Sequence, residues 1–299
     1  MSNKKYTVIT GASSGIGYAA AKAFAARGKN LIVTARREAQ LARLREEIAA
    51  AHPDVDVVIR TADLSVPENA HRLYDELRAY EIETWVNNAG FGSYGSVAEQ
   101  NLTKIESILR LNIEALTILS TLFVHDYRDA AGAQLINISS CGGYTIVPPA
   151  VTYCATKFYV SAFTEGLAQE LIASGAKLRA KVLAPAATAT EFGKVANDAA
   201  EYDYNARFGT YHTAEQMADF LLRLYDSDKI LGRVDRETYE FELTDPLLPY
   251  AAGSSRNQKC EEEPNKDTID ALHEAEQIVN DPAVVRYTDV EEALKELKR

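Results

Sequence analysis

The stretch that decides the fold is Tyr6-Thr7-Val8-Ile9-Thr10-Gly11-Ala12-Ser13-Ser14-Gly15-Ile16-Gly17, which an Ala-rich segment follows at once. A short β-branched run thus leads into a glycine-rich turn and then into a helical pattern. In such a turn the missing side chains let the backbone approach a pyrophosphate, and the helix N-terminus offers free N–H groups and a partial positive charge. The stretch therefore indicates the start of a nucleotide-binding α/β fold.

The same turn has two alternative interpretations. Its letters from Gly11 to Gly15 match the G-x-S-x-G turn that carries the nucleophilic serine of α/β hydrolases. That turn lies well inside its sheet and needs an oxyanion loop from an earlier strand, whereas no predicted strand precedes this one. The loop positions also offer no histidine and acid for Ser13. A tight turn that binds no ligand is the simplest alternative, and we favour phosphate binding over both.

Short apolar runs alternate with helical patterns along most of the chain. The predicted strands are residues 6–10, 31–34, 55–61, 84–87, 134–138 and 178–183. They are continuously apolar, as expected of parallel strands that are covered on both faces. The pattern predicts a Rossmann-type, doubly wound parallel α/β sheet of about seven strands, with helices on both faces and right-handed crossovers. Ligands of such sheets bind outside the carboxyl ends of the strands.

The composition argues against several other classes of protein. The 299 residues carry a formal net charge of −11, and no Lys/Arg cluster offers a site for nucleic acid. The longest apolar stretch, 116–124, is far shorter than the roughly 18 residues of a membrane helix. The first residues lack a signal or transit pattern, so we expect a soluble, cytoplasmic protein with no membrane partner. The cysteines and histidines show no ligand spacing, and we predict no metal site.

Two arginines, Arg36 and Arg37, follow the second predicted strand. An acidic residue at this place usually binds the ribose hydroxyls of NAD. A guanidinium can instead bind a 2′-phosphate through paired, charge-assisted hydrogen bonds. We therefore expect NADP rather than NAD as the cofactor, with Arg36 in contact with the phosphate. We expect Arg37 to be simply solvated, and the alternative is that both arginines are.

Tyr153 and Lys157 are four residues apart in a predicted helix, 152–174, and therefore share one helical face. A phenol has a pKa of about 10, and a close ammonium is expected to lower it toward working pH. The pair could then act as acid and base. The spacing alone is common on surface helices. However, Ser139 and Ser140 end the fifth predicted strand, where a hydroxyl could hold a substrate oxygen.

Other strand ends carry further candidate residues for binding a dinucleotide. The small residues of Asn87-Asn88-Ala89-Gly90, after the fourth strand, would let the adenosine side of the cofactor lie close to the backbone. Asp63-Leu64 follows the third strand, where a short carboxylate can bond an adenine amino group.

Over residues 4–250 the chain resembles a classical short-chain dehydrogenase/reductase. The resemblance rests on Thr10-Gly11-x-x-x-Gly15-x-Gly17, Asn87-Asn88-Ala89-Gly90, Ser140, Tyr153-x-x-x-Lys157 and Pro185. It implies that Tyr153 is the general acid in carbonyl reduction, that Lys157 tunes this phenol and binds the nicotinamide ribose, and that Ser140 holds the carbonyl oxygen. It also implies that Ser139 is structural.

The resemblance also implies a role for Asn112 and a set of cofactor-binding residues. Asn112 would position a water that links Lys157 to solvent, the alternative being an ordinary polar residue inside a helix. The expected cofactor-binding residues are Gly11, Ser13, Ser14, Gly15, Ile16, Gly17, Arg36, Asp63, Leu64, Asn88, Ala89, Gly90, Tyr153, Lys157, Pro185, Thr188 and Thr190.

This chain departs from the family pattern in two places. Ala186 stands where the family usually has glycine, which would restrict the nicotinamide loop if φ were positive there. Either Thr188 or Thr190 could then make the contact with the nicotinamide amide. In addition, many NADP-preferring members have a basic residue where Ser14 stands, so the predicted preference rests on Arg36.

The substrate and tail regions leave more alternatives open. Aromatic residues in 191–211 could line an apolar pocket or simply pack a lid: Phe192, Tyr202, Tyr204, Phe208 and Tyr211. We expect a catalytic domain, 1–253, and an acidic linker with an amphipathic helical tail, 254–299. The tail is similar to the toxin-binding ends of RelB-type antitoxins. We favour its packing in a homodimer or homotetramer over the binding of a partner protein.

Together these patterns predict an NADP(H)-dependent oxidoreductase that reduces a small-molecule carbonyl or oxidises the alcohol. The alternative is an NADP(H)-binding sensor or scaffold whose tail engages a partner protein. The intact set of Ser140, Tyr153 and Lys157 favours the enzyme, because a sensor has no need of it.

Overall fold

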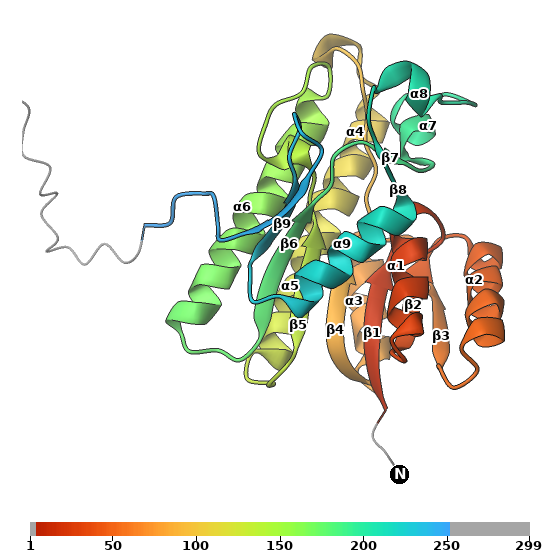
Figure 1. Ribbon diagram of the computed structural model, residues 1–299, viewed down its shortest axis with the longest axis vertical. Coiled ribbons are helices and arrows are strands. Elements are labelled where there is room, and N and C mark those ends of the chain that lie inside the picture. Colours follow the sequence, from red (N-terminus) through yellow and green to blue (C-terminus); the bar gives the residue numbers. More distant parts are fainter. Residues whose placement is uncertain (1–3, 252–299) are drawn as a thin grey trace, which may run out of the picture. The chain divides into compact units, whose positions relative to one another are not determined.

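The computed structural model describes residues 4–251 of the chain (Figure 1). Nearly all of them belong to one compact unit, Met1–Tyr250. The linker and the amphipathic helices predicted for residues 254–299 lie outside the described residues, so the domain boundary and the role of the tail stay predictions.

The sheet of this unit has eight strands in the order β3-β2-β1-β4-β5-β6-β9-β10 (Figure 1). Their bounds are β1 (Lys5–Thr10), β2 (Asn30–Ala35), β3 (Val57–Thr61), β4 (Glu81–Asn87), β5 (Gln134–Ile138), β6 (Arg179–Ala184), β9 (Leu231–Val234) and β10 (Phe241–Thr244). All neighbours are parallel except β9 and β10. The predicted doubly wound sheet is confirmed, with one strand more than expected. The last two strands are short and interrupted by charged residues, which hides them in the sequence.

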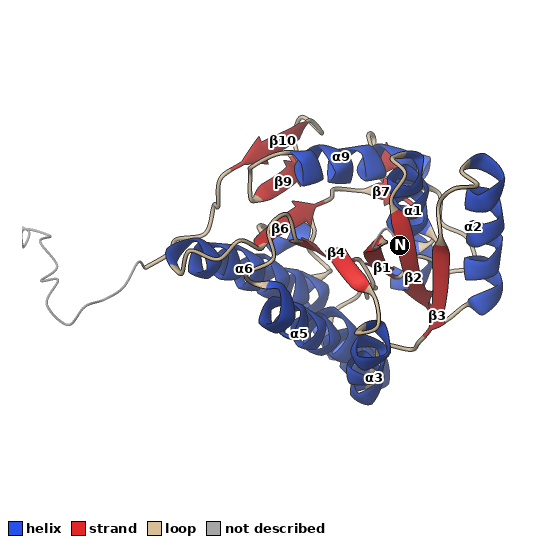
Figure 2. Ribbon diagram, turned by 90° about the horizontal axis from the view of Figure 1, so that it is seen from below, coloured by secondary structure: helices blue, strands red, loops and turns tan. Residues whose placement is uncertain are grey.

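Helices cover both faces of the sheet (Figure 2). One face carries α1 (Gly15–Ala26), α2 (Glu38–Ala51) and α9 (Ala214–Asp226), and the other carries α3 (Pro67–Leu77), α5 (Leu116–Tyr127) and α6 (Val151–Ala173). Successive strand residues therefore enter different cores: Ile9 and Leu31 pack on the α1 side, whereas Val8 and Ile32 pack on the α3 side. This double burial explains why the strand sequences are continuously apolar.

A long helix crosses the α3 side of the sheet. It runs from Leu102 to Tyr127 through α4 (Leu102–Leu109), a π-helical turn η2 (Arg110–Ala115) and α5. By length and composition alone this helix could span a membrane. However, Ala115, Leu119 and Phe123 are buried in the core beneath the sheet, as expected for a core helix of an α/β protein.

The remaining elements are short. They are the 3₁₀ turns η1 (Val97–Glu99) and η3 (Cys141–Gly143), the parallel pair β7 (Thr188–Ala189) and β8 (His212–Thr213), and the helices α7 (Phe192–Ala196) and α8 (Tyr204–Arg207). Both α7 and α8 lie at the upper end of Figure 1, beyond the carboxyl edge of the sheet.

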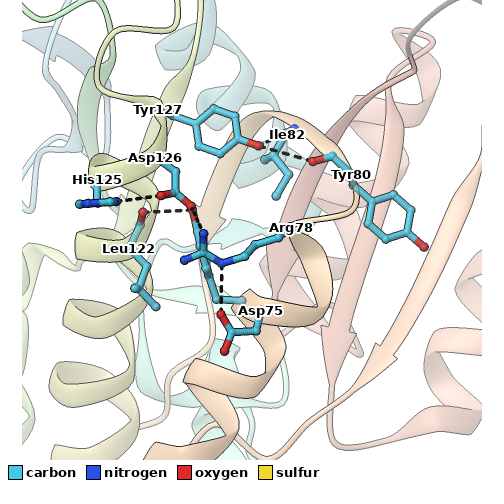
Figure 3. Close-up of polar contacts among 9 residues, drawn as sticks. Asp75, Arg78, Tyr80, Ile82, Leu122, His125, Asp126 and Tyr127 are labelled. Carbon is cyan, nitrogen blue, oxygen red and sulfur yellow. Dashed lines mark hydrogen bonds and ion pairs between the residues drawn. The ribbon is translucent and has the colours of Figure 1, made fainter.

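A polar cluster closes the opposite, amino edge of the sheet (Figure 3). Arg78 bonds to Asp75 at 3.1 Å and pairs with Asp126 at 3.1 Å. The Tyr127 hydroxyl accepts a bond of 3.2 Å from the backbone N–H of Ile82, at the start of β4. These contacts tie α3, α5 and β4 together at the amino edge.

Candidate functional site

A cavity of about 470 Å³ opens at the carboxyl edge of the sheet. The predicted site residues that line it are Gly11, Ser13, Ser14, Gly15, Ile16, Arg36, Asp63, Leu64, Asn88, Ala89, Gly90, Ser140, Tyr153, Lys157, Pro185, Thr188 and Thr190. Strands β1 and β4 are neighbours where the strand order reverses, and this brings distant parts of the sequence to one place. Gly17 and Asn112 lie just behind the lining.

The glycine turn is shaped for close approach. Gly11 has a φ of +68°, and a Cβ there would lie 2.8 Å from the Cα of Ala89. A Cβ on Gly17 would lie 2.4 Å from Nδ2 of Asn88, which donates a bond of 2.9 Å to the carbonyl of Thr10. The loop after β4 thereby braces the turn.

The N-terminus of α1 meets this turn. Ser14, the residue before α1, makes no side-chain cap, so the first N–H groups of the helix keep their capacity to bind an anion. A turn with glycine at its points of close approach, beside an uncapped helix N-terminus, fits the pyrophosphate of a dinucleotide.

The two arginines after β2 behave differently. Arg36 lines the cavity and makes no hydrogen bond or ion pair with the residues that the structure describes. Arg37 donates to the hydroxyls of Ser14 at 2.8 Å and Ser13 at 3.1 Å, and it pairs with Glu191 at 2.8 Å. The expectation that Arg37 is simply solvated is therefore wrong. Because it precedes α2 instead of standing inside it, its side chain reaches the glycine turn.

Helix α6 and the loop after β5 bring the predicted catalytic residues together. Tyr153 and Lys157 are both buried, and Nζ of Lys157 lies 5.9 Å from the centre of the Tyr153 ring. The same Nζ donates to the carbonyl of Ile138 at 2.8 Å. The Ser140 hydroxyl accepts a bond of 3.0 Å from the N–H of Gly142 and is also hydrogen-bonded to Tyr153. A phenol, a hydroxyl and an ammonium thus face one cavity.

Burial controls the protonation of this group. It raises the pKa of Tyr153 above the usual value, Tyr94 adds to the rise, and the hydrogen bond to Ser140 acts against it. Burial also lowers the pKa of Lys157 to about 8. The predicted lowering of the Tyr153 pKa is therefore not found. The ammonium bonds to Ile138 and does not touch the phenol oxygen, so the site favours a protonated Tyr153.

Ser139 and Asn112 support the site from behind. The buried Ser139 hydroxyl donates to the carbonyl of Lys157 at 3.0 Å, which is a structural contact. Nδ2 of the buried Asn112 donates to the carbonyl of Phe91 at 2.9 Å and to the hydroxyl of Thr156 at 3.1 Å. Asn112 thereby fixes the loop that carries Gly90. The water-positioning role that the family resemblance implies stays a prediction.

The loop after β6 adapts to Ala186 without strain. In residues 4–251 the non-glycine residues with positive φ are Asp198 and Tyr239, so Ala186 has ordinary backbone geometry. The Thr188 hydroxyl donates to the Ala186 carbonyl at 3.0 Å, whereas the Thr190 side chain packs against the glycine turn. Both threonines line the cavity, so both stay candidates for the nicotinamide contact.

Aromatic residues enclose the outer part of the cavity. The Phe192 ring lies 5.3 Å from the Tyr153 ring, and Tyr202 packs edge-on against Tyr204 at 4.9 Å. The cavity is lined by Phe192, Tyr202, Tyr204 and Phe208, whereas Tyr211 packs behind them against Tyr204, so four of the five aromatics form a wall of the cavity. The lining also includes residues that sequence reasoning missed because no motif marks them, among them Tyr94, Arg236 and Tyr239.

Comparison with known proteins fits this geometry. The family model of the short chain dehydrogenases matches residues 5–201. The chain belongs to the short-chain dehydrogenase family. Sulfoacetaldehyde reductase 2 from Chromohalobacter salexigens is 34% identical over 226 residues, which are 72% of this chain and 85% of that relative. Dehydrogenase/reductase SDR family member 11 from Homo sapiens is 29% identical over 194 residues, 63% of this chain and 75% of that one.

Solved structures show the same fold. A short-chain dehydrogenase from Sphingobium yanoikuyae in complex with NADPH superposes with a TM-score of 0.70 and 27% identity, covering 95% of this chain and 99% of its own. A short-chain dehydrogenase/reductase from Burkholderia phymatum in complex with NAD superposes with a TM-score of 0.67 and 24% identity. The match covers 77% of this chain and 89% of that one. This short-chain dehydrogenase is therefore an oxidoreductase with a dinucleotide-binding Rossmann fold.

Proposed function

We propose that the protein reduces a small-molecule carbonyl with NADPH, or oxidises the alcohol in the reverse direction, with Tyr153 as the proton donor. The observation that carries the proposal is that Ser140, Tyr153 and Lys157 line the same cavity as the glycine turn. When bound, the nicotinamide ring supplies or accepts the hydride.

In this proposal each of the three side chains has one task. Ser140 holds the carbonyl oxygen beside the phenol. Tyr153 gives its proton to that oxygen as the carbonyl carbon gains hydride, and a phenolate remains. Lys157 uses one N–H on Ile138, which leaves donors for a ribose hydroxyl and positive charge to stabilise the phenolate. Solvent then returns the proton to Tyr153. The burial that keeps Tyr153 protonated suits the donor role.

The preference for NADP rests on the end of β2. Arg36 lines the cavity and has no partner among residues 4–251, so its guanidinium is available to a 2′-phosphate. Ala35, Arg36 and Arg37 stand where an NAD-binding protein would place a carboxylate. The NADPH complex of the Sphingobium yanoikuyae relative supports the same cofactor.

The aromatic wall and the relatives support a carbonyl substrate of modest size. Phe192, which touches Tyr153, and the tyrosines around it suit an apolar or ring-bearing group beside the carbonyl. The Chromohalobacter salexigens relative is a sulfoacetaldehyde reductase, and its substrate is therefore also an aldehyde. We further expect the enzyme to act in the cytoplasm as a homodimer or homotetramer.

The experiment is a panel of aldehydes and ketones assayed with NADPH and with NADH. We expect NADPH to be consumed with at least one carbonyl. Arg36→Ala should weaken NADPH about ten- to hundredfold, the value of a charge-assisted hydrogen bond, and change NADH little. Arg45→Ala, an exposed position on α2, is the matched control. No NADPH consumption, or equal loss with both cofactors, would contradict the proposal.

A further inference from the structure

Two segments that are 154 residues apart in the sequence meet across the glycine turn. Arg37, after β2, donates from Nη2 to Oε2 of Glu191 at 2.8 Å and from Nη1 to Oε1 at 3.3 Å. The same guanidinium donates to the hydroxyls of Ser13 and Ser14. The contact is therefore a two-point ion pair anchored on the turn, and it lies on the wall of the cofactor cavity.

Glu191 is charged in this arrangement. The hydrogen bond from Arg37 lowers the pKa of its carboxyl, and the Ser14 hydroxyl adds to the effect. The side chains of Arg37 and Glu191 are each about half exposed, at 46% and 53%. Exposed ion pairs of this kind are weak, so a stronger anion could replace the carboxylate. A phosphate is such an anion, because it also accepts paired bonds from a guanidinium.

The neighbouring residues place that phosphate close by. Arg36 lines the same cavity and has no partner in the described part of the chain. A 2′-phosphate held by Arg36 would stand next to the guanidinium of the following residue. It would also bring a negative charge toward Glu191, which opposes binding while Glu191 stays paired.

We propose that Glu191 sets the cofactor preference by competing with the 2′-phosphate for Arg37. The inference rests on the proposed NADP-dependent function. A cofactor with a 2′-phosphate takes Arg37 over and releases Glu191, whereas a cofactor with a plain ribose offers no exchange and leaves the pair closed. Glu191 thus weakens the binding of NADPH selectively.

The exchange also reaches the catalytic end of the cavity. Glu191 directly precedes Phe192, whose ring packs on Tyr153 and whose N–H bonds to the Thr190 hydroxyl at 3.2 Å. Release of the Glu191 carboxylate therefore occurs at the start of α7, the segment that borders the cavity.

The test uses two ligands that differ only by the 2′-phosphate, adenosine 2′,5′-bisphosphate and 5′-AMP, titrated by calorimetry. The proteins are the full-length wild type, Glu191→Gln, Arg37→Gln and the double variant. Glu191→Gln should bind the bisphosphate about two- to fivefold more tightly, the value of an exposed ion pair, and bind 5′-AMP unchanged. Arg37→Gln should weaken the bisphosphate, and adding Glu191→Gln to it should give little further gain. Glu201→Gln, at an exposed position with no hydrogen bond or ion pair among residues 4–251, should leave the affinity for both ligands unchanged.

Several results would overturn the inference. One is that Glu191→Gln binds the bisphosphate no more tightly than the wild type does. Another is that its affinities for the bisphosphate and for 5′-AMP change equally. The third is that Glu191→Gln gives the same gain in affinity when Arg37→Gln is also present. Because calorimetry measures binding and needs no turnover, its result is independent of whether the proposed reaction occurs. If the expected cycle appears but no carbonyl consumes NADPH, the reaction fails and the competition stands. If the wild type does not bind the bisphosphate, both the cofactor assignment and the inference fail.

Discussion

Within residues 4–251 two lysines are buried, Lys157 and Lys181, and their ammonium groups make different contacts. Lys157 on α6 is 6% exposed and Lys181 on β6 is 1% exposed. Burial lowers the pKa of both ammonium groups to about 8. Yet Nζ of Lys181 donates to three carbonyls at the end of α9, at 2.6 to 3.0 Å, whereas Nζ of Lys157 donates to the single carbonyl of Ile138 and lines the cavity.

Burial and a lowered pKa are common to both lysines, so neither property by itself marks a functional lysine. An ammonium has three donors. All three donors of Lys181 can be used by its three bonds to carbonyls of the protein. Its charge also lies at the C-terminus of a helix, where a positive charge is favourable. Lys157 keeps donors for a ligand. We therefore expect Lys181 to contribute to stability and Lys157 to the proposed reaction.

The largest effect is expected from Lys157→Met. This change removes the charge that stabilises the phenolate and the donors offered to the cofactor, so kcat/KM should fall about 10²- to 10⁴-fold. The free energy of unfolding should change little. The variant loses one hydrogen bond to the carbonyl of Ile138, but it also no longer has to bury a charge. Steady-state kinetics and thermal unfolding on the same preparation check both parts. A large loss of melting temperature with retained activity would reverse the comparison.

Lys181→Met should show the opposite pattern. The three carbonyls lose a charged donor, so the free energy of unfolding should fall by about 2 kcal/mol, or roughly 4–8 °C in Tm. The kcat/KM of the remaining folded enzyme should stay near the wild-type value. Lys177→Met, at an exposed position without side-chain contacts in the described region, is the control and should leave Tm unchanged. A drop in Tm no larger than that of the control would sink the structural role.

A smaller effect is expected in the pH dependence of the free energy of unfolding, to which both lysines contribute. Both lysines have a folded pKa of about 8 against 10.5 for the free side chain. Below pH 8 both states are protonated, and the cost of burying the charge is fully present. Between pH 8 and 10.5 the unfolded chain binds more protons, so stability rises with pH. Denaturant unfolding at pH 7.5 and 9.5 should show this rise in the wild type and a smaller rise in Lys181→Met. Equal slopes would contradict the shifted pKa.

The sequence predicted the parts of the site that short motifs carry. The glycine turn, the Tyr153-x-x-x-Lys157 spacing and Ser140 each reflect local geometry, and the strand order then brings them together. Contacts between distant segments were out of reach. Nothing near Arg37 indicates that it meets Glu191, and a lysine inside the β6 run gives no sign that Lys181 reaches the end of α9.

The protonation state of Tyr153 also could not be predicted from its four-residue spacing to Lys157. The i,i+4 pattern places Tyr153 and Lys157 on one face, but it does not say where the donors of the ammonium go. The carbonyl of Ile138 takes one of them, and burial then decides the direction of the Tyr153 pKa. Strands β9 and β10 were not predicted for a related reason. Their few apolar residues show no strand pattern by themselves and pack against other residues only once the rest of the sheet has formed.

The role of Tyr153 as proton donor is tested by Tyr153→Phe, with NADPH binding and carbonyl reduction measured on the same preparation. The phenyl ring keeps the packing against Phe192 and loses only the hydroxyl. We expect the Kd for NADPH to stay within about twofold, while kcat falls by at least about 10²-fold for loss of the proton donor. Reduction at the wild-type rate would show that the proton comes from another group and that Tyr153 is not the donor.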